Sequence, residues 1–348
     1  MSFRVCVWVA ALVVAALVVA LDDGRAFAQA EKLTPLDPVR TVHVGTVNQS
    51  SDAGLYVALE KGYFAELGLK VELVTFTSAA TMIAPMGSGE LDVGGGAVSA
   101  GLWNAELRKV GIRAVADKGS TRAGWSYFGL VAKKDGPVQR CEDLKGKTVS
   151  NASLSNGVLH AIELWLGTCG LSLKDVDVKA LGYPEVMPAL INGGVAAGHL
   201  GEPLISVGLA NGTIKVLARQ DEMRPVDQVA LLYFSEKFRG DTEAARRFTV
   251  AYVRGIQDYL AAYAKGSPPA DWFIDVMMKY TRVKDRSVFA TVVPAGLDSW
   301  GRMDLAAMRS DFDWFKARRL IASQDATFES AIDTSFVDFA GAYLQAKH

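Results

Sequence analysis

The 348-residue sequence predicts an α/β protein built of two similar lobes. The main observation is a motif that occurs twice, MIAPMGSGELDVGGGAVS at residues 82–99 and MPALINGGVAAGHLGEPL at residues 187–204. Each copy predicts an apolar helix, a glycine turn, a short apolar strand, a glycine-containing loop and the start of another helix. Two alike α/β halves favour a cleft between lobes, where small ligands bind near the carboxyl ends of parallel strands.

The composition is that of a folded globular protein. Half of the residues are hydrophobic and 22% are charged, which is enough to build a full core. The net charge is −1 and no segment is rich in Lys or Arg, which argues against nucleic acid as the main partner.

The first half of the chain predicts a mostly parallel sheet flanked by helices. Strands are expected over residues 41–47, 70–76, 91–93 and 112–116, where Val and Leu dominate. Helices are expected over 54–65, 78–86 and 99–109, with Gly68 as a helix stop. This β-α-β-α-β order is typical of parallel strands.

The second half repeats the pattern between two long strands. Residues 125–133 predict a strand that crosses to the second lobe, and residues 227–234 predict one that returns. Amphipathic helices follow from Asp241 onward. Between the crossings, strands are expected over 147–150, 176–181, 196–200 and 213–218, with helices beginning near Ser155, Pro184 and Pro203. We therefore expect lobe I at 38–128 and 229–348, and lobe II at 129–228.

Residues 1–30 are typical of a cleaved signal peptide. Arg4 precedes an apolar run over 5–21, and small residues before Glu31 fit cleavage after Ala28 or Ala30. An uncleaved anchor is the alternative, because the run is close to the minimum length of a membrane span. Nothing later is apolar for long enough to span a bilayer, so we expect a soluble periplasmic chain.

Cys141 and Cys169 are the two cysteines that follow the expected signal peptide. An oxidising compartment permits a disulfide. A helix over 154–167 that runs back beside the strand at 147–150 would bring its end to the level of Cys141. The sequence leaves open a bridge or two inert buried thiols. It has no C-x-x-C and no zinc-ligand spacing, so no metal or other cofactor is expected.

Three short motifs resemble a known family. They are GYF at 62–64 ahead of GLKVE at 68–72, GELDV at 89–93, and DLKGK at 143–147 before a strand. With these motifs the chain resembles, over about residues 40–235, the SsuA/THI5-like (NMT1-like) substrate-binding proteins of ABC importers, a group with nitrate, taurine, sulfonate and pyrimidine-precursor receptors. The resemblance implies a type II periplasmic binding protein fold with two crossing strands as its hinge. It also implies a monomer that passes a solute to a permease with its cytoplasmic ATPase. The second copy of the repeat departs from the first, because Ala197 stands where Asp92 does.

Polar residues that follow the expected strands are the candidate ligand contacts. The cluster at 48–52 follows the first strand, and the cluster at 153–156 lies at the matching place in lobe II. Helix capping alone is the alternative for their Ser and Asp side chains. The full candidate set is Asn48, Gln49, Ser50, Asp52, Ser78, Ala97, Ser99, Trp125, Ser153, Ser155, Asn156, Tyr183 and Glu202.

Several of these candidates have a second interpretation. Trp125 and Tyr183 could sandwich a flat ligand or pack in a core. Glu202 could accept bonds from a ligand or cap the next helix. Residues 94–101 predict a glycine-rich loop that lets backbone approach a ligand, with Ser99 as donor or N-cap. The AVSAG around Ser99 approximates a hydrolase elbow but has no neighbouring His and acid in the sequence, so no catalytic residue is expected.

Charge at the candidate cleft favours a small organic ligand. The candidates include two acidic residues, Asp52 and Glu202, and one nearby cation, Arg122. A strongly anionic ligand such as sulfate would prefer more positive charge, so an organic acid, sulfonate or heterocycle is expected instead. One alternative is a THI5-like enzyme of pyrimidine synthesis, but the Cys-rich iron-binding motif of that branch is missing. The other is the sensing module of a signalling system, which normally continues into a membrane segment and a kinase.

Overall fold

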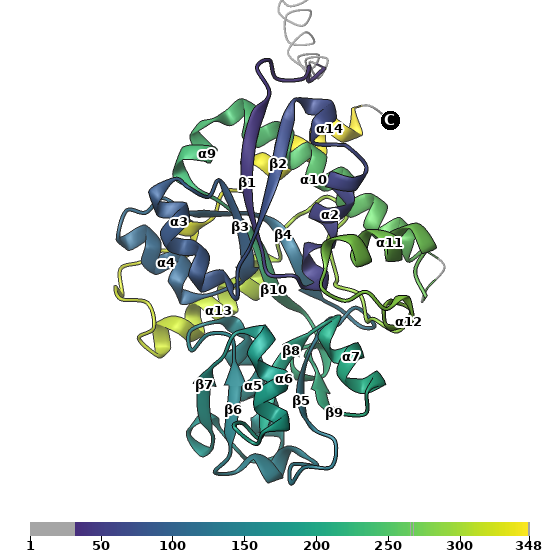
Figure 1. Cartoon of the computed structure of the whole chain (residues 1–348). Coiled ribbons are helices and arrows are strands. Elements are labelled where there is room, and N and C mark those ends of the chain that lie inside the picture. Colours follow the sequence, from purple (N-terminus) through teal and green to yellow (C-terminus); the bar gives the residue numbers. More distant parts are fainter. Residues whose placement is uncertain (1–31, 265, 267, 347–348) are drawn as a thin grey trace, which may run out of the picture.

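The computed structural model describes residues 32–264, 266 and 268–346. These residues form two lobes, one above the other in Figure 1. No helix in this part of the chain combines the length and apolar character needed to cross a membrane. The expected signal peptide at 1–30 lies outside the described residues.

Lobe I is built on a five-stranded sheet in the order β2-β1-β3-β10-β4. Strand β1 pairs in parallel with β2 and β3, whereas β10 is antiparallel to both of its neighbours. The strands are β1 (Arg40–Thr46), β2 (Leu69–Thr75), β3 (Val93–Ala97), β4 (Arg113–Thr121) and β10 (Asp227–Phe234).

Lobe II repeats this arrangement in the order β7-β6-β8-β5-β9. Strand β6 is parallel to β7 and β8, and β5 runs antiparallel between β8 and β9. The strands are β5 (Phe128–Lys133), β6 (Thr148–Asn151), β7 (Asp177–Ala180), β8 (Ala197–Gly201) and β9 (Ile214–Arg219). The middle strands β3 and β8 both come from the duplicated motif, so the expectation of two alike halves is confirmed.

Helices cover both sheets, and the longest are in the C-terminal part of the chain. Helix α10 spans 21 residues and packs against α2 and α14, with Phe248 against Phe64 in the core of lobe I. The helices of the first two thirds of the chain are α2 (Ala53–Glu60), α3 (Ile83–Ser88), α4 (Ala100–Leu107), α5 (Gly157–Thr168), α6 (Tyr183–Ile191), α7 (Leu204–Ala210) and α8 (Gln220–Met223). The later ones are α9 (Glu236–Gly240), α10 (Thr242–Ala262), α11 (Asp271–Tyr280), α12 (Arg286–Phe289), α13 (Leu305–Ala317) and α14 (Ser335–Gln345).

The glycine run at 94–96 is a buried strand, so the expected glycine-rich loop is wrong. The strand expected at 91–93 instead begins at Val93 and continues through the glycines as β3. Packing explains the glycines. A Cβ at Gly95 would overlap the Lys118 side chain, and a Cβ at Gly96 would overlap Ala79. Gly94 is similarly closed in by Met86. The glycines therefore make room for neighbouring residues, and Gly96 also lines the cavity between the lobes.

The two crossings between lobes differ in form. The returning strand β10 matches its expected range of 227–234. The outgoing strand expected at 125–133 is shorter, because a turn closed by Trp125 N and Arg122 O at 2.8 Å separates β4 from β5. The turn itself is Ala123 and Gly124, and the first three residues of the expected strand, 125–127, lie between this turn and β5.

Cys141 and Cys169 form a disulfide, which settles the alternative that the sequence leaves open. Their Cα atoms are 6.1 Å apart. Cys169 directly follows α5, which returns from the interlobe side of the sheet to the level of Cys141. The bridge lies within lobe II.

Candidate ligand cleft

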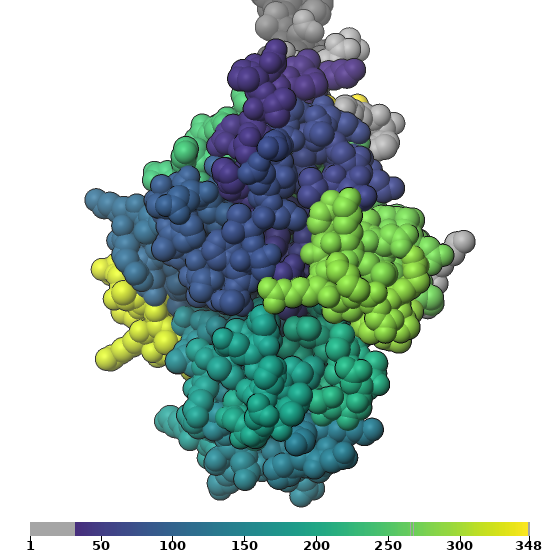
Figure 2. All heavy atoms as spheres, in the orientation of Figure 1, coloured from purple at the N-terminus to yellow at the C-terminus, as the bar shows by residue number. Residues whose placement is uncertain are grey.

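The lobes meet where strands of both sheets end. Backbone hydrogen bonds cross the junction from Gly157 N to Val98 O (2.9 Å) and from Ala100 N to Ser155 O (2.9 Å). Ser50 N also donates to Glu202 O at 3.0 Å. Figure 2 shows dark-blue residues of lobe I in contact with teal residues of lobe II, with the light-green segment that carries α11 and α12 beside them. The structure is therefore a closed arrangement.

A small inner cavity lies between the lobes. Its volume is about 30 Å³, which is enough for a compact polar group. Its described lining contains no charged side chain. The lining residues are Val47, Ser51, Ser78, Ala79, Ala80, Gly96, Ala97, Ser99, Phe128, Ala152, Ser153, Asn156, Tyr183, Val229 and Ala230.

Asn156 presents a free donor at this cavity. Its Oδ1 atom accepts from Asn151 Nδ2 at 2.7 Å and caps α5 through Leu159 N. Its Nδ2 atom is buried and has no hydrogen-bond partner among the described residues. A buried donor without a partner costs about 1–3 kcal/mol, so a ligand acceptor at this position would gain binding energy.

Two serines of lobe I add hydroxyl groups. Ser78 and Ser99 occupy the N-cap positions of a short 3₁₀ helix (Ala79–Met82) and of α4. Neither side chain makes a capping hydrogen bond in the described structure. Capping alone therefore does not explain these two residues, and both hydroxyls border the cavity.

A wider outer groove continues from the inner cavity. It has a volume of about 300 Å³ and shares Val47 and Tyr183 with the cavity. Burial raises the pKa of Tyr183 well above its usual value, so this hydroxyl stays neutral. Exposed Arg282 is the one cationic side chain among the described residues of the groove. They are Val47, Asn48, Gln49, Thr75, Phe76, Thr77, Tyr183, Pro184, Met187, Pro203, Leu204, Thr281, Arg282 and Val283.

Asp52 lies behind the cavity in a buried ion pair. Its Oδ1 atom is 2.7 Å from Lys118 Nζ, and both side chains are 0% exposed. Its Oδ2 atom accepts from Val47 N and Gln49 N. Lys118 also donates to Ser51 Oγ at 3.1 Å. The pair therefore shapes the loop at 47–52, and Asp52 is not a free acid facing a ligand.

Lys118 was not among the sequence candidates, and Ser51 was in the cluster at 48–52 but not in the final candidate set. The strand expected at 112–116 ends two residues before Lys118, so nothing pointed to its burial. The one available signal was Gly95, whose missing side chain makes room for Lys118.

Glu202 and Trp125 also lie away from the cavities. Glu202 is fully buried, pairs with Arg219 Nη1 at 3.0 Å and accepts from Ser206 N in the first turn of α7. Trp125 packs edge-on against Tyr259 and Tyr263 of lobe I. Core and capping roles therefore describe these two residues. The candidate cation Arg122 lies over the Trp125 ring at 4.6 Å.

The structure thus divides the candidates into three sets. Those at the inner cavity are Ser78, Ala97, Ser99, Ser153, Asn156 and Tyr183. Those at the outer groove are Asn48, Gln49 and, again, Tyr183. Those that line neither are Ser50, Asp52, Trp125, Ser155 and Glu202.

The model of the family described as NMT1/THI5 like matches residues 49–263, which include most of the residues that line this cleft and both crossings. The chain belongs to this family. No curated protein matches the chain in sequence. The described residues of this NMT1/THI5-like protein contain no group of three or more His, Cys, Asp or Glu that could hold a metal ion.

Solved structures share the fold. A ligand-binding component of an ABC-type import system from Staphylococcus aureus with zinc bound has a TM-score of 0.71 at 14% identity, covering 86% of this chain and 99% of its own. The alkanesulfonate-binding protein SsuA from Xanthomonas axonopodis pv. citri bound to MOPS has a TM-score of 0.68 at 15% identity, covering 85% and 98%. The nitrate-binding protein NrtA from Synechocystis PCC 6803 has a TM-score of 0.65 at 13% identity, covering 88% of each chain. The expected two-lobe periplasmic binding protein fold is confirmed.

Proposed function

We propose that this chain is an extracytoplasmic receptor that captures a small organic solute between its lobes and delivers it to an ABC permease with its cytoplasmic ATPase. The supporting observation is that free donors from both lobes border one cavity, Asn156 Nδ2 from lobe II and the Ser78 and Ser99 hydroxyls from lobe I. A solute that bonds to both lobes favours the closed arrangement over an open one. The periplasm, a monomeric state and removal of residues 1–30 are parts of the same proposal.

The two compartments suggest how the solute lies. The inner cavity suits a compact group that accepts hydrogen bonds, because its free polar groups include an amide donor and hydroxyls. The outer groove offers apolar surface from Phe76, Met187 and Leu204, and a cation at Arg282. An organic acid, a sulfonate or a polar heterocycle has both features. Structures of the same fold include an alkanesulfonate-binding protein with MOPS and a nitrate-binding protein, which supports an oxyanion as the inner group.

Binding rather than catalysis is the role that the lining supports. Ser99 borders the cavity, but the described lining contains no His, Asp, Glu or Lys side chain that could act as its general base. The serines and Asn156 can hold a group in place by hydrogen bonds.

A thermal-shift screen followed by calorimetry tests the proposal. MOPS, short alkanesulfonates, nitrate, pyrimidines and aromatic acids are the probes, and at least one is expected to raise the melting temperature. Asn156→Asp keeps the oxygen that caps α5 and replaces the free donor with a second oxygen. It should weaken binding of the best probe by about 1.5–3 kcal/mol if that probe is anionic.

The matched control is Asn211→Asp, which changes an exposed asparagine just after α7. It should bind the probe with unchanged affinity. Equal affinity in the Asn156→Asp variant would show that the solute lies elsewhere, and no shift with any probe class would count against a receptor for these solutes.

A further inference from the structure

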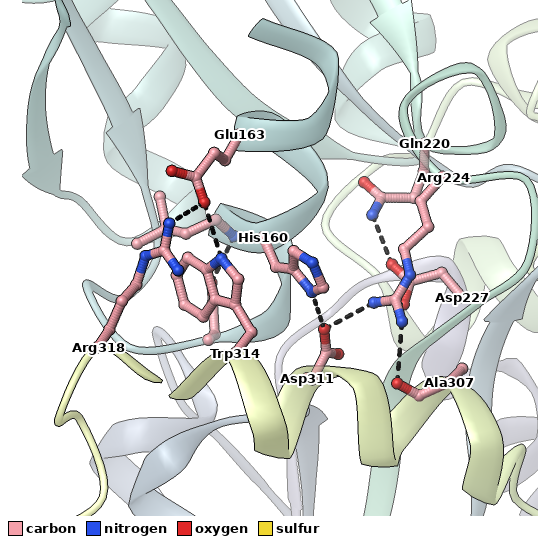
Figure 3. A network of polar contacts seen from close by, with 11 residues as sticks. His160, Glu163, Gln220, Arg224, Asp227, Ala307, Asp311, Trp314 and Arg318 are labelled. Carbon is pink, nitrogen blue, oxygen red and sulfur yellow. Dashed lines mark hydrogen bonds and ion pairs between the residues drawn. The ribbon is translucent and has the colours of Figure 1, made fainter. Parts of the chain in front are cut away.

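Helix α13 contacts both lobes and is not itself part of the cavity lining. Phe312 lies against Trp103 of α4 in lobe I, with ring centroids 5.1 Å apart. On lobe II, Trp314 stacks on His160 of α5 at 5.3 Å and donates from Nε1 to Glu163 at 2.8 Å. Figure 3 shows His160, Glu163 and Trp314 between the teal helix α5 and the yellow-green helix α13. Helix α13 therefore links the lobes beside the hinge.

Asp311 is the centre of this link. It is fully buried, and its Oδ1 atom accepts from His160 Nδ1 at 2.8 Å and from Arg224 Nη1 at 2.6 Å. Arg224 also bonds to Asp227 Oδ1 at 2.9 Å and to Ala307 O at 2.9 Å. Groups from α5, from the segment between α8 and β10, and from α13 thus converge on one carboxylate (Figure 3).

The same carboxylate touches the turn of α5 that borders the ligand cavity. Asp311 Oδ2 has no hydrogen-bond partner among the described residues and lies against Gly157, where a Cβ would overlap it. Gly157 follows Asn156 and donates its amide to Val98 of lobe I. The position of Asp311 is therefore coupled to the interlobe backbone bridge and to the free donor of Asn156.

The cluster is short of one positive charge. Two carboxylates, Asp227 and Asp311, share one guanidinium, Arg224, and one imidazole, His160. Charge balance requires one proton on the imidazole or on a carboxylate.

The surrounding groups leave that deficit in place. Gln220 donates to Asp227 and is neutral, and Glu163 is paired with Arg318. Asp304 adds another negative charge near Asp227, and burial together with the Asp311 carboxylate raises the pKa of Asp227 to about 7. The assembled cluster holds its proton up to about neutral pH.

We propose that α13 is an interlobe clamp, in which the contact of Asp311 with His160 and Gly157 holds the lobes closed, keeps Asn156 at the cavity and depends on one bound proton. When the lobes part, α5 carries His160 away from Asp311, water reaches the cluster, and the burial that favours a proton on Asp227 is relieved. The closed form therefore binds the proton more tightly than the open form. Its extra stability is present below pH 7 and is lost as pH rises through about 7, by at most tenfold per pH unit for one proton.

Hydrogen exchange without any solute tests the clamp. Protection of the Ala100 and Gly157 amides, corrected for the intrinsic effect of pH, is measured at pH 6, 7 and 8. The wild type should lose roughly three- to tenfold protection between pH 6 and pH 8. Asp311→Asn keeps the side-chain shape and should be less protected at pH 6 and independent of pH. The control Asp313→Asn changes an exposed residue of the same helix and should behave as the wild type.

Gly157→Ala tests the clamp without changing a charge. The added methyl group should push α5 from Asp311 and lower the protection of Ala100 severalfold at pH 6, even if Asp311→Asn does not fold. A wild type that is insensitive to pH, an Asp311→Asn variant equal to wild type, or unchanged Ala100 protection in Gly157→Ala would each overturn the clamp. Because no solute is present, failure of the receptor proposal leaves these outcomes unaffected.

Discussion

The loops at the ligand ends of the two sheets have the same place in their lobes but are held by different chemistry. In lobe I, the loop after β1 is fixed by the buried ion pair of Asp52 and Lys118. In lobe II, the loop after β6 is fixed by the neutral side chain of Asn151, whose Nδ2 atom donates to Ser153 O and Asn156 Oδ1, both at 2.7 Å.

This difference has energetic consequences. A buried ion pair contributes little while intact and is costly to break, because one charge remains buried alone. An amide network is less costly to break, because its partners are neutral. Lobe II also has the disulfide, whereas lobe I has the helices from α9 onward. The two lobes should therefore respond to mutation with different magnitudes.

The largest effect is expected at Lys118. Lys118→Met removes the charge, retains much of the volume and leaves Asp52 buried without its partner. The free energy of unfolding should fall by about 3–5 kcal/mol, measured by urea denaturation. Lys279→Met is the control, because Lys279 pairs with Glu60 at the surface. If Lys118→Met and Lys279→Met lowered the free energy of unfolding equally, the buried ion pair of lobe I would be no more costly to break than a surface pair.

The disulfide should have the next largest effect. It closes a loop with a sequence separation of 28. Replacing Cys141 and Cys169 together by serine should lower the free energy of unfolding by about 2–4 kcal/mol, mainly through a less constrained unfolded chain. Exchange protection should fall first in lobe II. A uniform loss across both lobes would mean that they unfold as one unit.

The smallest effect is expected at Asn151. Asn151→Ala removes both bonds to the loop of lobe II and should lower the free energy of unfolding by about 1–3 kcal/mol. Asn192→Ala, at an exposed position after α6, serves as the reference. If Asn151→Ala lowered the free energy of unfolding as much as Lys118→Met, the buried charge would not explain a difference in stability between the two loops.

Local sequence patterns were enough to predict the two-lobe architecture. The duplicated motif indicated two alike halves, and the range of β10 agreed at both ends because an apolar strand of eight residues has a clear signal. The Cys pair was left open in the sequence, since pairing depends on distance in space. The glycine run was misread for a similar reason, because the sequence does not show that Lys118 and Ala79 fill the space beside β3.

The site was less accessible to sequence reasoning. Strand order places the loops at 47–52 and 151–156 at one edge, so Asn48, Ser153 and Asn156 could be expected at a cleft. Whether a polar side chain faces a ligand or another residue depends on its partners, which come from distant parts of the chain. Asp52 forms an ion pair with Lys118, and Glu202 forms one with Arg219. Trp125 packs against Tyr259. Periodicity and motif order in the sequence predict the two-lobe fold and the family, because both are patterns of neighbouring residues. Which polar groups stay free follows from the folded chain, because hydrogen bonding and charge pairing depend on contacts between residues far apart in sequence.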